Sequence, residues 1–243
     1  MKRFFPFLFA ALLMIPSASQ AQDKPEPYVD AALVSHYMWR GQDLGNVCFQ
    51  PEIGVRWKGL DFNIEGCTGF TRYEYEELDV NLTYTLKGFM IGLSDMWAEN
   101  TSDDERYFSY GWEKGHQLEG LLGYECKYGS LTWRTIFAGN DQKLNGKRAY
   151  STFIELAVPF LFYDLDWDFR VGLCPFESAG YINIYEETEY YYAKSFGINM
   201  VSLRATKNFP LGKGFKLPVF VEIHTNPAAQ NARLLMGVSL ATL

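Results

Sequence analysis

The sequence lacks the features that mark helical membrane proteins, nucleic-acid-binding proteins and hydrolases. Beyond residue 21, no segment stays apolar and uncharged for the roughly 18 residues that a membrane-spanning helix requires. Lys and Arg number 22 against 29 Asp and Glu, and no basic face stands out, which argues against nucleic acid as a partner. The three histidines fall in no zinc or nucleophile-elbow motif, so the sequence predicts no catalytic residues, no metal ligands, no cofactor and no enzyme activity.

The first 21 residues predict export. Met1, Lys2 and Arg3 form a short basic start, an apolar run occupies 4–15, and small residues suit cleavage after Ala21. The apolar run is too short to anchor the chain in a membrane, and no cysteine follows the cleavage point as a lipoprotein would require. We expect a signal peptide at 1–21 and a single domain at 22–243 in a bacterial envelope.

Apolar and polar residues alternate through the rest of the chain. In 77–86 every second residue from Leu78 to Leu86 is apolar and the others are polar or charged, which is the period of a β-strand. Twelve such segments are predicted, most of them near the ten residues that cross a bilayer when tilted. The pattern slips near Asp95 and Val201, where we expect β-bulges. The predicted strands are 28–41, 48–58, 60–70, 77–86, 89–98, 117–128, 130–138, 150–160, 163–173, 193–206, 215–225 and 231–242.

The predicted connections alternate in length. The longer set is 42–47, 71–76, 99–116, 139–149, 174–192 and 226–230, and the shorter set is 58–59, 87–88, 129, 161–162 and 207–214. Transmembrane barrels have longer outer loops and short periplasmic turns, with rings of aromatic residues at both ends of the strands. We therefore expect an all-β, up-and-down antiparallel transmembrane β-barrel of about 12 strands in outer-membrane lipid. A soluble periplasmic β-protein is the weaker alternative, because a charged face leaves few bulky side chains to fill its interior.

Two segments carry a resemblance to a known family. Ser35-His36-Tyr37-Met38-Trp39-Arg40-Gly41 is followed by Pro51-Glu52-Ile53-Gly54, and a tyrosine-rich segment, 185–192, precedes a late strand. These segments resemble those of uncharacterised Gram-negative outer-membrane β-barrel proteins called TorF-like or Gcw-type. The resemblance implies an outer-membrane or transport-associated role and carries over no catalytic residues.

If the apolar face meets lipid, the polar face lines a lumen. One interpretation is a network of salt bridges that braces the wall, and another is a path for small polar solutes beside an acidic ladder at Glu155, Asp164, Asp166 and Asp168. The predicted function is a narrow channel, and the alternative is a closed structural barrel whose outer loops bind a partner. The predicted lumen-lining residues are His36, Arg40, Glu52, Arg56, Asp61, Glu65, Asp79, Glu119, Glu125, Arg134, Glu155, Asp164, Asp166, Asp168, Arg170, Glu222 and His224.

The histidines and cysteines leave further alternatives open. His36 and His224 are expected near the closing seam of the barrel beside Glu222, as hydrogen-bonded lumenal histidines or, less favoured, as a metal site. Cys48 and Cys67 are expected on paired strands and on one face, where they form a disulfide or remain thiols.

Overall fold

A computed structural model describes residues 24–70, 75–98, 106–111, 114–182, 185–212 and 215–241. The expected signal peptide at 1–21 and parts of the expected loops 71–76 and 99–116 lie outside these residues. Within them, no helix is long and apolar enough to cross a membrane. The strands are β1 (Glu26–Val34), β2 (Tyr37–Trp39), β3 (Gln42–Gly45), β4 (Cys48–Trp57), β5 (Leu60–Gly69), β6 (Glu77–Leu86), β7 (Phe89–Ala98), β8 (His116–Cys126), β9 (Gly129–Gly139), β10 (Thr152–Phe162), β11 (Leu165–Cys174), β12 (Gly180–Ile182), β13 (Thr188–Tyr190), β14 (Gly197–Gly212), β15 (Phe215–Asn226) and β16 (Asn231–Ala241).

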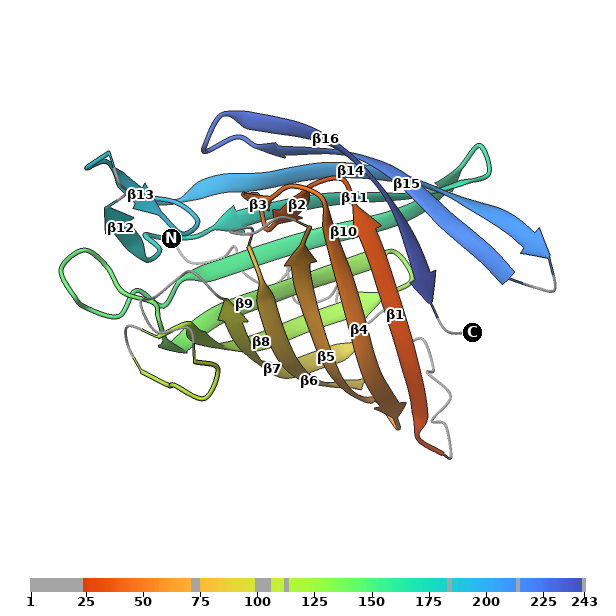
Figure 1. Ribbon diagram of the computed structural model, residues 1–243, viewed down its shortest axis with the longest axis horizontal. Coiled ribbons are helices and arrows are strands. Elements are labelled where there is room, and N and C mark those ends of the chain that lie inside the picture. Colours follow the sequence, from red (N-terminus) through yellow and green to blue (C-terminus); the bar gives the residue numbers. More distant parts are fainter. Residues whose placement is uncertain are drawn as a thin grey trace, which may run out of the picture.

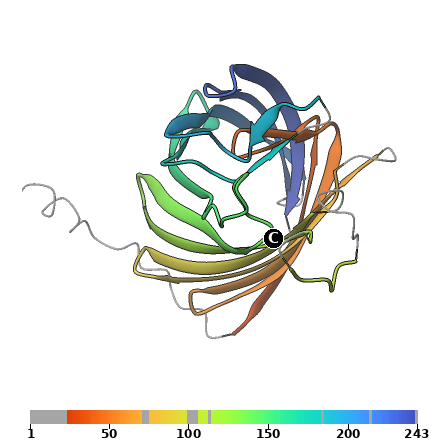
Figure 2. The same cartoon turned by 90° about the vertical axis from the view of Figure 1, so that its left-hand side faces the viewer.

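Twelve of these strands form one closed antiparallel barrel, which confirms the expected fold class and strand count (Figure 1). The order around the ring is β1, β16, β15, β14, β11, β10, β9, β8, β7, β6, β5 and β4, so β1 closes the barrel against β16. The other four strands make two short hairpins, β2 with β3 and β12 with β13. Figure 2 looks in from one end and shows the strands as a ring around an interior.

Two-residue turns connect the strands at one end of the barrel, here called the turn end. Lys58 and Gly59 have φ of 50° and 86°, and Lys87 and Gly88 have φ of 51° and 85°. Type I′ turns need positive φ at both central residues, and Gly reaches this region without strain, so each Lys-Gly pair produces a tight hairpin. The opposite end, here called the loop end, carries the longer connections, as the sequence predicts.

Several predicted boundaries at the turn end are wrong. Between β8 and β9 the turn is 127–128 rather than 129, and between β10 and β11 it is 163–164 rather than 161–162. Residues 207–212 continue β14 rather than forming a connection. In the β10–β11 and β14–β15 hairpins, backbone pairing extends beyond the point where the apolar pattern becomes irregular, whereas in the β8–β9 hairpin it ends earlier, at the pair Cys126–Gly129.

Alternation along the barrel strands places apolar side chains on the outside. Ile53, Leu93 and Leu122 are 58%, 56% and 61% exposed, although they lie in the middle of their strands. Exposed aromatic residues gather at the turn end, where Phe160 and Trp167 stack at 6.0 Å and Tyr163 is 83% exposed. The outer surface is therefore an apolar band with an aromatic rim.

Register shifts interrupt the barrel ladders between β11 and β14, between β8 and β9, and between β14 and β15 near Pro210. In β14, Asn199 is skipped between the pairs Gly172–Met200 and Leu173–Ile198, close to the slip predicted near Val201. The register of β7 is continuous through Asp95, so the bulge predicted there is wrong, and the irregularity falls between β8 and β9 instead. The continuous register places Asp95 on the apolar face, where its carboxylate accepts hydrogen bonds from Tyr110 Oη at 2.9 Å and His116 Nδ1 at 2.7 Å.

Candidate functional site

The predicted strand 28–41 ends early, and the chain after it folds into the barrel. β1 stops at Val34, and residues 37–45 form a hairpin, here called the plug hairpin, with Trp39 paired to Gln42 across a turn of Arg40 and Gly41. The two turn residues have φ of 48° and 85°, the same combination as at Lys58-Gly59. A basic residue followed by Gly therefore produces the same type of turn here, but inside the lumen.

Arg40 anchors the tip of the plug hairpin to the barrel wall. Its Nη2 donates to Glu119 Oε1 at 2.7 Å, its Nη1 also bonds Glu119, and the same Nη1 donates to Tyr192 Oη at 2.8 Å. The Glu119 side chain is 1% exposed and that of Arg40 is 10% exposed. The guanidinium also lies 4.1 Å from the Trp39 ring centroid and 5.6 Å from that of Phe153. A bidentate ion pair with stacked aromatic rings suits the planar guanidinium and would not suit Lys.

The backbone of the tip fits against the bulge in β14. Asn199 Nδ2 donates to the Arg40 carbonyl at 3.2 Å, and Asn226 Nδ2 donates to the Gly41 carbonyl at 2.9 Å. A Cβ on Gly41 would lie 1.7 Å from the Asn199 carbonyl oxygen, so no other residue fits at this position without displacement. The bulge in the wall and the glycine in the plug hairpin are therefore complementary.

The base of the plug hairpin is held near the barrel seam. His36 Nε2 donates to Asp43 Oδ1 at 2.6 Å, and Arg233 Nε of β16 donates to Asp43 Oδ2 at 2.9 Å. Tyr37 is buried and its hydroxyl bonds Glu77 of β6. The prediction that His36 lies on a lumenal strand is wrong, because it precedes the hairpin and bonds within the same segment.

Two cavities lie on either side of the plug tip and share Trp39, Asp79 and Met96 in their linings. The cavity toward the loop end, here called the outer cavity, has a volume of about 450 Å³. The cavity on the other side, here called the inner cavity, has a volume of about 310 Å³ and includes Arg40 in its lining. The plug tip, which carries Trp39 and Arg40, therefore lies between the two cavities and is here called the constriction.

Charges in the inner cavity are largely paired. Arg170 Nη2 donates to Asp168 Oδ2 at 2.6 Å, and its Nη1 lies 3.5 Å from Glu155 Oε1. Glu222 accepts from Arg204 Nε at 2.6 Å and from His224 Nδ1 at 2.9 Å. These contacts form a network of salt bridges along the wall, which is one of the two interpretations of the polar face drawn from the sequence.

The acidic ladder does not form a continuous column. Asp164 lies in the β10–β11 turn and not on the wall, and Asp166 near it accepts a hydrogen bond from Asn208 at 2.7 Å. The other two members, Asp168 and Glu155, pair with Arg170. A single-sign field along this wall is therefore absent from the lumen residues that the structure describes.

The remaining predicted lumen residues form smaller groups. Toward the turn end, Tyr28 Oη lies 2.7 Å from Glu52 Oε1 and 3.0 Å from Asp61 Oδ1, so its single proton can be donated to either carboxylate. Arg56 Nε donates to Asp61 Oδ2 at 2.9 Å. Nearer the loop end, Glu65 Oε1 accepts a hydrogen bond from Asn81 Nδ2 at 2.9 Å. The last three members of the predicted set occupy different places: Arg134 Nη1 lies 3.3 Å from Glu119 Oε1, Asp79 lines both cavities, and Glu125 is exposed near the turn end of β8.

The histidines and cysteines are placed as follows. His36 and His224 bond different carboxylates, and the described residues contain no group of three or more His, Cys, Asp or Glu that could hold a metal ion. Cys48 and Cys67 are buried in one cluster with Tyr37 and are present as thiols. The disulfide that the sequence allows is absent from the structure, and oxidation of the pair stays a prediction.

Sequence reasoning missed several residues that hold the plug hairpin: Trp39, Gly41, Tyr192, Asn199 and Asn226. The dipeptide Arg40-Gly41 is a signal that could have revealed the turn, because it repeats the basic-Gly pattern of 58–59 and 87–88. No local pattern in the sequence identifies the residues of the barrel wall that contact this turn.

Comparisons with known proteins found similarity only among solved structures. No family model and no curated protein matches the chain, so the resemblance to TorF-like or Gcw-type proteins stays a prediction. One similar chain comes from a structure described as "Unveiling the Mechanism Behind the in-meso Crystallization of Membrane Proteins", with 9% identity, 89% of this chain and 83% of that chain covered, and a TM-score of 0.46. Another is OmpF of Salmonella typhi in complex with daunomycin, with 10% identity, coverage of 90% and 98%, and a TM-score of 0.40.

Proposed function

We propose that the protein is an outer-membrane channel that passes small polar solutes through a lumen narrowed by the plug hairpin. The observation that carries this proposal is a closed barrel with an apolar outside and a polar inside that holds cavities on both sides of Trp39 and Arg40. Channel walls need this distribution, because lipid excludes polar groups while a hydrated lumen accepts them.

Location in a membrane is supported by the outer surface. All barrel strands have two hydrogen-bonded neighbours, so the ring has no open edge that lipid would leave unsatisfied. The band of exposed Leu, Ile, Val and Phe would be an aggregation hazard in water and is favourable against acyl chains. The loop end faces outward in this arrangement, and the turn end, where β1 starts, faces the periplasm.

The constriction limits which solutes can move through the lumen. The outer and inner cavities each have room for a small solute, and a solute moving between them must pass Trp39 and Arg40. Because Arg170, Arg204 and their carboxylate partners alternate in sign, the inner cavity presents polar groups to a solute without strongly repelling either charge.

The second candidate is a closed structural barrel whose loops bind a partner. The buried Arg40–Glu119 pair favours it, because a plug hairpin tied this firmly keeps the lumen closed unless the pair opens.

Planar bilayers distinguish the two candidates. We expect purified wild-type protein to give small single-channel conductances, and a variant with residues 36–46 replaced by a flexible Gly-Ser linker to give larger ones. A silent wild type with a conducting linker variant would favour the closed barrel, and silence of both would refute the channel. Fractionation gives an independent check, because release by osmotic shock without detergent would contradict a membrane location.

A further inference from the structure

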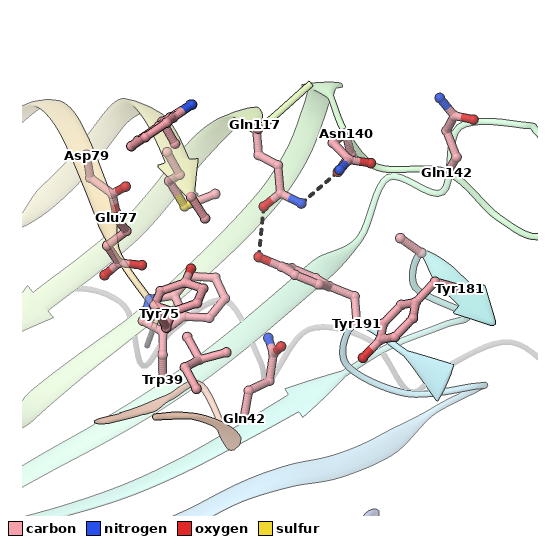
Figure 3. A pocket seen from close by; sticks show the side chains of 17 residues that line it. Trp39, Gln42, Tyr75, Glu77, Asp79, Gln117, Asn140, Gln142, Tyr181 and Tyr191 are labelled. Carbon is pink, nitrogen blue, oxygen red and sulfur yellow. Dashed lines mark hydrogen bonds between the residues drawn. The ribbon is translucent and has the colours of Figure 1, made fainter. Parts of the chain in front are cut away.

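The outer cavity has the composition of a binding site for a cationic ligand. Trp39, Tyr75, Tyr181 and Tyr191 contribute aromatic rings, and no Lys, Arg or His is among the described residues that line it (Figure 3). Its volume of about 450 Å³ lies in the range typical of small-molecule sites. Aromatic faces carry negative partial charge and attract ammonium groups.

Buried polar atoms on residues that line this cavity have no hydrogen-bond partner among the described residues. Two of them are Asp79 Oδ1, an acceptor, and Gln42 Nε2, a donor. The Asp79 side chain is 7% exposed and lines both cavities. Buried polar groups are almost always paired in folded proteins, so a cluster of unpaired ones marks where a ligand completes the bonding.

Negative charge gathers on one wall of the cavity. Asp79 lies two residues from Glu77 on β6, Figure 3 shows both side chains on the same side, and the charge of Glu65 also acts on Asp79. Arg40, the cation of the constriction, is bound by Glu119. Because no three of these groups are placed to hold a metal ion among the described residues, a bare cation is a poor match.

We propose that the outer cavity binds a small organic cation that also carries hydroxyl or carbonyl oxygens. Its ammonium group bonds Asp79 and Glu77 against the aromatic rings, and one of its oxygens accepts a hydrogen bond from Gln42 Nε2. The inference rests on the proposed function, since it names the solute class that the channel entrance selects.

Glucosamine and glucose form a matched pair of probes, because they share a ring and differ in one ammonium group. Titration of the purified full-length protein in detergent, at about pH 6 where the amine is protonated, is followed by calorimetry or by Trp fluorescence. We expect glucosamine to bind at least about 10-fold more tightly than glucose, since a bond to a charged group is the stronger kind.

Three variants test the assignment of atoms. Asp79→Asn keeps the shape and removes the charge, so we expect it to abolish the preference for glucosamine. Gln42→Met keeps the length of the side chain and removes the N–H donor, so we expect both sugars to bind a few-fold more weakly. Glu177→Gln removes a negative charge from a loop residue, which pairs with Lys143 and does not line the cavity, and should leave binding unchanged.

Each outcome is decisive. Equal affinity for the two sugars, an unchanged preference in Asp79→Asn, or no binding of glucosamine at millimolar concentration would overturn the inference. If Asp79→Asn does not fold, unweakened binding of both sugars by Gln42→Met would overturn it. Conductance without glucosamine binding refutes only the assignment of this cavity, whereas binding without conductance refutes only the channel.

Discussion

Replacing Arg40 by Gln tests whether one buried ion pair closes the lumen. The substitution removes the charge at the tip of the plug hairpin and leaves Glu119, which is 1% exposed, without its main partner. The barrel ladder does not include Arg40, so the wall should stay folded while the plug hairpin loosens. We therefore expect a larger single-channel conductance in Arg40→Gln than in wild type.

The size of the effect follows from the burial of the pair. Removing one partner of a buried ion pair costs about 3–5 kcal/mol, because the other charge is left unpaired in a poorly solvating environment. Arg134 Nη1 remains 3.3 Å from Glu119 Oε1 and is 31% exposed, so it compensates in part. The lower end of the range, about 3 kcal/mol, raises the undocked fraction of the plug hairpin roughly 100-fold.

Planar-bilayer recording measures the result, with circular dichroism as the check that the barrel is intact. Arg56→Gln is the matched control, because its pair with Asp61 is half-exposed and such pairs contribute about 0–1 kcal/mol. The double variant Arg40→Met, Glu119→Leu removes both charges and should restore much of the docking, since apolar replacement of a whole buried pair is often neutral.

Two results would refute the reasoning. Conductance in Arg40→Gln equal to that of wild type would show that the ion pair does not control the constriction. A loss of barrel structure in Arg40→Gln but not in Arg56→Gln would show that the plug hairpin supports the wall, rather than only occupying the lumen.

The remaining predictions concern the fit of the plug hairpin, the exposed apolar surface of the barrel and one buried loop carboxyl. Gly41→Ala should raise the conductance through its clash with the wall, whereas Gly146→Ala, also at positive φ but with nothing within 4 Å of the added Cβ, should not. Leu82→Lys, on the outward face of β6, should lower the free energy of unfolding in lipid vesicles by about 2–4 kcal/mol, and Thr83→Lys, facing inward, should change it much less. Burial raises the pKa of Asp141, a loop residue, so its carboxyl contributes most to stability below its unfolded pKa, and this contribution disappears as pH rises through the folded pKa. Hydrogen exchange of its loop should therefore speed up across that window in wild type and not in Asp141→Asn; equal profiles would contradict the assignment.

The barrel was predictable because its signals are local. A side-chain period of two fixes which residues of a strand share a face, and β6 and β7 match the predicted segments residue for residue. The turn at Lys87-Gly88 fixes the register between them. The end of β10 was misplaced because Leu161, Phe162 and Tyr163 are all bulky and apolar or aromatic, so the alternation no longer shows where pairing stops.

The site was less predictable because its partners are distant in sequence. The sequence predicts both Arg40 and Glu119 as lumen residues. No sequence pattern, however, indicates that the two residues contact each other or that Asp164 lies in a turn. The alternation through 28–41 fits a single long strand equally well, and the correct choice depends on contacts that form only in the closed ring.

The sequence by itself thus determined a barrel with a polar interior, since alternation and turn chemistry act over a few residues. Tertiary structure decided that the Arg40-Gly41 turn lies inside that barrel. The Arg40 guanidinium bonds Glu119, 79 residues away, and the Gly41 carbonyl accepts from Asn226, 185 residues away. A buried charge is stable only where such partners converge, and only closure of the ring brings them together.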